Sequence, residues 1–135
     1  MTTTTLIKNP RTLIAAATSN AAGATTNGTP IDLRTSSGGT LTIKLANGGT
    51  GPTMQAVANV LIAHDSGPTP TGASAGAVWK TLWSFGGGTS ANAVTEQALA
   101  IDASVMHLHV QVTGNNGQAV VGEAFLSELT SFNTV

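Results

Sequence analysis

The stretch GTLTIKLA at Gly39–Ala46 decides the fold class of this 135-residue sequence. Apolar and polar side chains alternate along it: Leu41, Ile43 and Leu45 fall on one face, and Thr40, Thr42 and Lys44 fall on the other. A period of two residues is typical of a β-strand with one buried face, because successive side chains point to opposite sides of a sheet. We therefore predict a half-buried strand here.

A second alternating stretch, SVMHLHVQVT at Ser104–Thr113, predicts another strand. One of its faces holds Met106, Leu108, Val110 and Val112, and the other holds Val105, His107, His109 and Gln111. The turn residues GNNG at 114–117 follow, and then a further apolar stretch, Gln118–Leu126. Two strands joined around an Asn-Gly pair predict a β-hairpin.

Short apolar runs separated by loops rich in Gly, Pro, Asn, Ser and Thr fill the rest of the chain. They predict strands at Arg11–Thr18, Pro30–Thr35, Met54–His64, Val78–Phe85 and Ala93–Ile101. Ala and Gln would also allow short helices at Met54–His64 and Ala91–Ala100, but β-branched and Thr-rich composition favours strands. Seven to nine strands predict an all-β fold, a single antiparallel β-sandwich that is jelly-roll-like or immunoglobulin-like.

The beginning of the chain differs from the rest. Residues 1–11, MTTTTLIKNPR, contain four consecutive threonines and no apolar periodicity. We expect them to form an extended N-terminal arm, and residues 12–135 to form the β-sandwich domain. With no cysteine in the chain, packing alone or packing against further copies must stabilise this domain.

The low charge of the chain limits its function. Charged residues make up 8% of the sequence, with five cations and six anions, whereas an average domain has about 25%. Five cations cannot form a basic groove, so we expect no nucleic-acid partner. No run of 18 apolar residues is present, so we expect no membrane partner. A surface of Thr, Ser, Asn, Gln, Gly and Ala suits a protein that packs against many neighbours.

His107 and His109 form the sharpest chemical motif, because two imidazoles at i and i+2 of a strand point to one face and can bind a metal. A third ligand could be His64, Asp65, Asp102 or Glu123. The spacing is similar to the HxH signature of cupins, but the carboxylate expected soon after the pair is missing from Val110–Thr113. The sequence therefore predicts no metal, no cofactor, no catalytic residue and no enzyme.

The largest aromatic patch of the sequence lies in one predicted strand. Trp79, Thr81, Trp83 and Phe85 alternate and would share one face. Aromatic side chains most often fill a core. The functional alternative is a platform for a sugar or a protein partner.

The style of the whole chain resembles virion structural proteins of tailed bacteriophages, especially small capsid decoration (cement) proteins with a β-sandwich or jelly-roll fold. The resemblance rests on the start MTTTTLIKNP, the loops LANGGTGPT at 45–53 and DSGPTPTGASAGA at 65–77, and the uncharged strands between them. It implies a non-enzymatic protein on the capsid exterior, assembled in the host cytoplasm. Many copies would bridge major capsid subunits and stabilise the shell.

The resemblance implies two partners: the major capsid protein and further copies of the chain itself, as a dimer or trimer. We predict interface residues in the arm and in the aromatic strand, namely Thr4, Leu6, Ile7, Pro10, Trp79 and Trp83. Two alternatives remain open. One is a tail, neck or fibre component, and the other is a carbohydrate-binding module that uses the two tryptophans.

Overall fold

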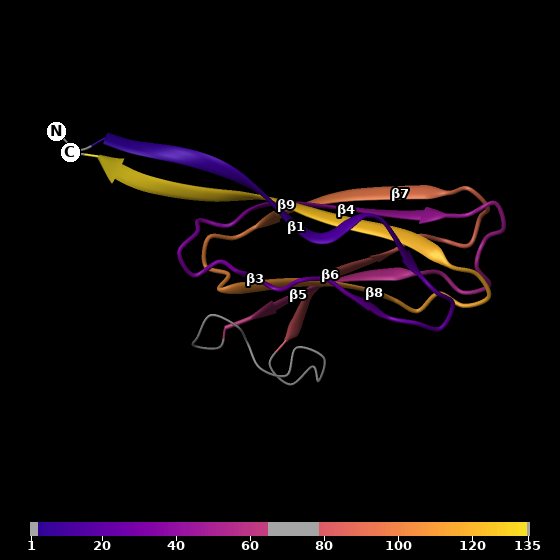
Figure 1. Ribbon diagram of the computed structural model, residues 1–135. Coiled ribbons are helices and arrows are strands. Elements are labelled where there is room, and N and C mark those ends of the chain that lie inside the picture. The colour runs from indigo at the N-terminus through magenta and orange to yellow at the C-terminus, as the bar shows by residue number, and fades with distance from the viewer. Residues whose placement is uncertain (1–2, 65–78, 135) are drawn as a thin grey trace.

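Two antiparallel β-sheets face each other in a computed structural model of the chain, which describes residues 3–64 and 79–134 (Figure 1). Sheet A has the strand order β1-β9-β4-β7, and sheet B has the order β2-β8-β5-β6, with β3 also paired to β8. The nine strands of the described residues are β1 Thr3–Asn20, β2 Thr26–Asn27, β3 Ile31–Asp32, β4 Gly39–Asn47, β5 Val57–Ala63, β6 Lys80–Gly86, β7 Val94–Ile101, β8 His107–Thr113 and β9 Val120–Thr134.

This strand order is that of a jelly roll. The two short strands β2 and β3 both pair with β8, so they occupy one position in sheet B. With that position counted once, each sheet has four strands, and most connections cross from one sheet to the other. Eight positions in two four-stranded sheets form the double Greek key of a jelly roll. The predicted all-β, jelly-roll-like sandwich is confirmed.

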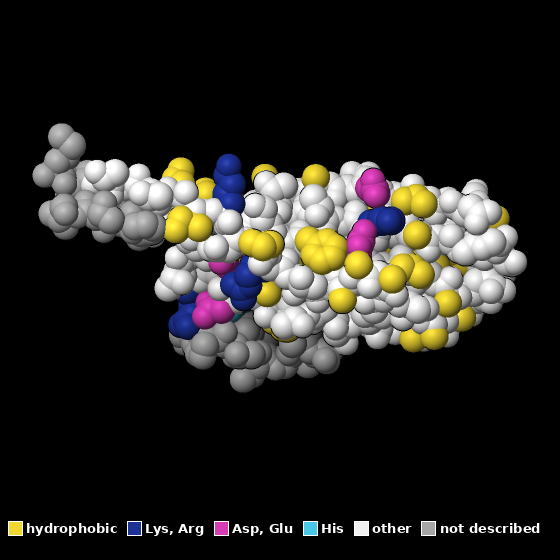
Figure 2. All heavy atoms as spheres, turned by 45° about the horizontal axis from the view of Figure 1, so that its top comes forward, with side chains coloured by type: hydrophobic (Ala, Val, Ile, Leu, Met, Phe, Trp, Pro, Cys, Tyr) yellow, Lys and Arg dark blue, Asp and Glu magenta, His cyan; other side chains and the backbone are white. Residues whose placement is uncertain are grey.

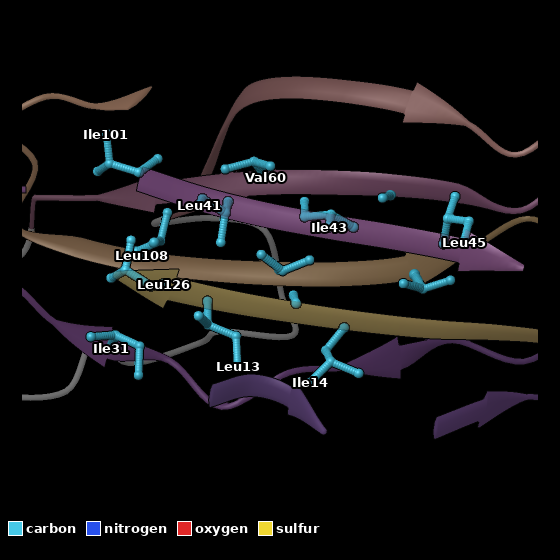
Figure 3. Close-up of a cluster of buried hydrophobic side chains, with 14 of the residues drawn as sticks. Leu13, Ile14, Ile31, Leu41, Ile43, Leu45, Val60, Ile101, Leu108 and Leu126 are labelled. Carbon is cyan, nitrogen blue, oxygen red and sulfur yellow. The ribbon is translucent and has the colours of Figure 1, made fainter. Parts of the chain in front are cut away.

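The core lies between the sheets and consists of aliphatic side chains (Figure 3). Leu41, Ile43 and Leu45 of β4 are all at most 3% exposed, so the face predicted from their alternation is the buried one. Leu108 and Val110 of β8 meet them from sheet B. Burial of such side chains stabilises the fold by about 1.5–3 kcal/mol each relative to exposure.

The predicted strands are present, and both segments that could have been helices are strands. Met54–His64 contains β5, and Ala91–Ala100 contains most of β7. Pro30–Thr35 shortens to β3. The part of the chain that the structure describes holds no helix long and apolar enough to cross a membrane.

The predicted hairpin across 114–117 is wrong, because β8 lies in sheet B and β9 lies in sheet A. The segment between them crosses the end of the sandwich. The side chain of Asn115 is buried, at 1% exposure, and its hydrogen bonds hold the segment in this position. Its Nδ2 donates to the carbonyl oxygens of Asn20, at 3.0 Å, and Gln118, at 2.9 Å, so the segment is tied to the end of β1.

The arm is a two-stranded ribbon, with the C-terminal end of β9 as its second strand. β1 runs from Thr3 to Asn20 without a break at residue 11 and pairs with β9 from Thr3↔Thr134 to Asn20↔Val120. The strand on the other side of β9, β4, begins only at Gly39, opposite Glu128. Residues 3–8 and 129–134 therefore project beyond the sandwich as a pair, which we call the arm ribbon (Figure 1).

Candidate interaction surface

The arm ribbon presents apolar side chains on both of its faces. Lys8 and Pro10 line a hollow together with Phe125 on the face of sheet A that points away from the core, called here the outer face. Because strand side chains alternate, Thr4 and Leu6 continue this face and Ile7 lies on the opposite one. Leu6 is 64% exposed and Ile7 is 37% exposed. Three of the four predicted arm residues, Thr4, Leu6 and Pro10, thus lie on the outer face.

In the arm ribbon, β1 and β9 form strand pairs only with each other among the described residues. Each strand of a two-stranded ribbon is an edge strand, and an edge strand can pair with a strand of another chain. Asn9 Nδ2 donates to Thr130 Oγ1 at 3.1 Å, which links the two strands near the base of the ribbon. An isolated pair of strands is only marginally stable in water. The pairing of the two strands alone therefore stabilises the ribbon only weakly.

The outer face of sheet A carries a second surface, which sequence reasoning missed as a unit. A hollow of about 340 Å³ lies over β4, β7 and β9, and Lys44, Glu96, Glu123 and Phe125 are among its lining residues. Lys44 Nζ lies 3.7 Å from Glu123 Oε1. In Figure 2 acidic and basic side chains gather on this face among small apolar ones. Only the polar side of Gly39–Ala46 hinted at it in the sequence.

The two tryptophans lie on opposite faces of sheet B, so the prediction that they share one face is wrong. A register shift between Val60 and Leu61 places Trp83 opposite Val60 but Thr81 opposite Leu61. Trp83 packs against the core, with its ring centroid 5.1 Å from that of Phe85. Trp79 is 3% exposed, and its ring lies 5.3 Å from that of His109. A sugar platform built from both tryptophans is not present; their part in an interface stays a prediction.

The two histidines are buried on the face of β8 that points away from the core, at 0% and 1% exposure. His107 Nδ1 lies 3.9 Å from Asp32 Oδ1. Burial lowers the pKa of His109 below its ordinary value. No group of three or more His, Cys, Asp or Glu side chains that could hold a metal is found among residues 3–64 and 79–134. Asp65, one candidate third ligand, lies outside the described residues.

Asp32 belongs to a local charge pair at the end of β3. Its Oδ1 accepts from Arg34 Nε at 3.0 Å, and its Oδ2 accepts from Arg34 Nη2 at 3.0 Å. This hydrogen bonding is the main cause that lowers the pKa of the Asp32 carboxyl below its usual value. The pair links Asp32, at the end of β3, to Arg34 in the loop that leads to β4.

No protein-family model and no curated protein matches the sequence. Several solved structures share its fold. The infectious bursal disease virus VP2 subviral particle aligns with a TM-score of 0.52 and 11% identity over 93% of this chain and 33% of that chain. The K3 cleaved adhesin domain of Lys-gingipain from Porphyromonas gingivalis w83 aligns with a TM-score of 0.55 and 11% identity, over 81% of this chain and 71% of that one.

The infectious bursal disease virus Gx strain structure gives a similar alignment, with a TM-score of 0.53, 12% identity and coverage of 93% and 32%. This chain thus spans about a third of the length of these two infectious bursal disease virus chains. At these identities the likeness shows the fold alone, a β-sandwich that also occurs in viral particles.

Proposed function

We propose that this chain is a non-enzymatic structural protein of a virion: a decoration (cement) protein that binds the outside of an icosahedral phage shell and bridges major capsid subunits. The observation that carries the proposal is the arm ribbon. It projects beyond the sandwich as a single pair of strands, and it holds two exposed aliphatic side chains, Leu6 and Ile7.

The ribbon can contact a partner in two ways. Its edges can add main-chain hydrogen bonds to a strand of a neighbouring subunit. Its aliphatic side chains can be buried against apolar surface, which contributes about 25 cal/mol per Å² removed from water. A protein that contacts two joined subunits, but not the separated ones, stabilises the shell by mass action. Many weak contacts around a shell add to this effect.

The nearly uncharged sandwich supports the same proposal. Five cations and six anions are spread over 135 residues, so little charge has to be desolvated when copies pack closely on a shell. The capsid exterior is then the expected location, after assembly in the host cytoplasm. The sandwich fold is compatible with this role, since it is shared with the virus structures described above.

Cosedimentation tests the proposal. Shells assembled from the major capsid protein of the same genome are mixed with the full chain and pelleted. We expect the chain to pellet with the shells and to raise their melting temperature. A variant with both Leu6→Asp and Ile7→Asp should lose most of its binding while its far-UV circular dichroism stays unchanged.

Met54→Asp is the matched control, because Met54 is 60% exposed but lies away from the arm ribbon, and it should bind like wild type. A chain that stays in the supernatant contradicts the proposal. Binding to isolated tails or necks, and not to shells, would favour the alternative of a tail, neck or fibre component.

A further inference from the structure

We propose that the outer face of sheet A binds a second copy of this chain through a two-fold contact, in which Lys8 of each copy pairs with Glu96 of the other. This inference goes beyond the proposed function, because it concerns the contact between copies and not the contact with a shell.

Not every charged side chain of the outer face is paired within the chain. Over residues 3–64 and 79–134, most charged side chains have a partner: Arg11 pairs with Glu128, Arg34 with Asp32, and Lys44 with Glu123. The side chains of Lys8 and Glu96 form no ion pair and no hydrogen bond with the described residues, and both residues are exposed. Apart from the Lys44–Glu123 pair, the described part of the outer face thus presents one unpaired positive side chain, Lys8, and one unpaired negative side chain, Glu96.

Lys8 and Glu96 lie at opposite ends of the outer face. Lys8 is opposite Leu129 of β9. Glu96 is opposite Lys44, which in turn is opposite Glu123 of β9. The two positions are therefore about 20 Å apart along the strands and about 14 Å apart across them, at about 3.4 Å per residue and 4.8 Å per strand. They mark the two ends of a diagonal across the sheet.

The centre of this diagonal lies between β9 and β4, next to Phe125 and Thr42, which are opposite each other. A two-fold axis through this point, parallel to the sheet and perpendicular to the diagonal, exchanges the two charged positions. Both Lys8–Glu96 pairs then form together, and the two Phe125 rings meet near the axis. A two-fold interface must be self-complementary in this way.

The outer face is hollowed at three places that adjoin one another. The central hollow shares Lys44 and Glu123 with the second, and it shares Thr42 and Phe125 with the third. Beside the charged side chains, their lining includes the half-buried Phe125 and small residues such as Ala16, Ala46 and Ala98. A partner can thus approach closely, and a ring in the centre of an interface is a typical anchor. The side of the arm ribbon that bears Ile7 stays free for a shell.

A charge swap tests this contact on the full chain. Analytical ultracentrifugation of the wild type should show a particle of twice the 13.4 kDa chain mass. Lys8→Glu and Glu96→Lys should each place two like charges together and weaken dimerisation at least tenfold. The double variant restores both pairs with exchanged signs and should dimerise again, which no general loss of folding could mimic.

Asp102→Lys is the matched control, since it makes the same charge change in the loop after β7 and lines none of the three hollows, and it should remain dimeric. A wild-type monomer or trimer, or single charge variants that remain dimeric, would overturn the inference. A monomer that binds a glycan on this face would overturn it too. Shell binding is measured separately, so a failed dimer does not decide the proposed function.

Discussion

Arg11 of β1 and Glu128 of β9 form an ion pair, with 3.0 Å between Nη1 and Oε2, at the point where the arm ribbon leaves the sandwich. Glu128 is 5% exposed, whereas the Arg11 side chain is 40% exposed. The pair joins the two strands on the side opposite to Phe125, diagonally across the ladder. The guanidinium thus covers a carboxylate that would otherwise be buried without a partner.

Arg11→Met is expected to lower the free energy of unfolding by about 1–3 kcal/mol, because it leaves the Glu128 carboxylate buried and unpaired. Urea denaturation followed by circular dichroism measures the change. Lys44→Met is the control: its pair with Glu123 is longer, at 3.7 Å, and more exposed, so the loss should stay below about 1 kcal/mol. The double variant R11M/E128M should recover stability; if it is worse than R11M alone, the buried carboxylate is not the cause.

The strands could be predicted from the sequence because each is a local pattern. Alternation at Gly39–Ala46 placed Leu41 and Ile43 on the buried side, where the structure has them. The pairing of strands depends on distant residues, and this is why the hairpin prediction failed. Asn-Gly is a good local signal for a hairpin, but Asn115 satisfies carbonyl groups of both Asn20 and Gln118, and that network directs the chain into the other sheet.

Gly39→Ala should destabilise the fold strongly. Gly39 has φ +156°, and a Cβ at this position would overlap the carbonyl oxygen of Ser127, which belongs to the neighbouring strand β9. We expect a loss of about 3 kcal/mol from the clash and the strained backbone together. Gly48→Ala is the control, because open space surrounds the position of its Cβ, and it should change stability by at most about 0.5 kcal/mol. Equal effects of both substitutions would contradict the close approach of β4 to β9.

His109 should make the fold less stable in mild acid. Burial lowers its pKa in the folded state, so the unfolded state, with a pKa of about 6.5, binds the proton more tightly. The stabilisation is fully present above about pH 6.5 and is lost as the pH falls below it, with a slope of at most about 1.4 kcal/mol per pH unit. Urea titrations between pH 7.5 and 5 measure this slope.

His109→Phe keeps an aromatic ring beside Trp79 and removes the titrating group, so the slope should become flatter. If the wild type shows the same unfolding free energy at pH 5 and pH 7.5, burial of His109 has no such effect.

The candidate interface was only partly visible in the sequence. Leu6 and Ile7 stood out as apolar residues among threonines, and the structure exposes both. The C-terminal strand of the ribbon was missed, because the apolar alternation of Gln118–Leu126 ends before Glu128. The prediction that the tryptophans share one face failed for another reason. A single extra residue at the bulge beside Val60 turns Trp79 to the other face. A bulge leaves no simple mark in an alternating sequence pattern.

Asn115 and Asn116 distinguish the crossing segment from a hairpin. In a hairpin, Asn116-Gly117 would be the critical turn pair and Asn115 would be exposed. In the jelly roll, Asn115 is 1% exposed and its Nδ2 donates to three carbonyl oxygens, while Asn116 is exposed and its Oδ1 accepts from the Gly117 amide at 2.9 Å. Asn115→Ala leaves buried carbonyl groups without a donor, and we expect a loss of about 3 kcal/mol in the free energy of unfolding. Asn116→Ala should cost less than about 1 kcal/mol, and the reverse order of these two values in urea denaturation would contradict the crossing between the sheets.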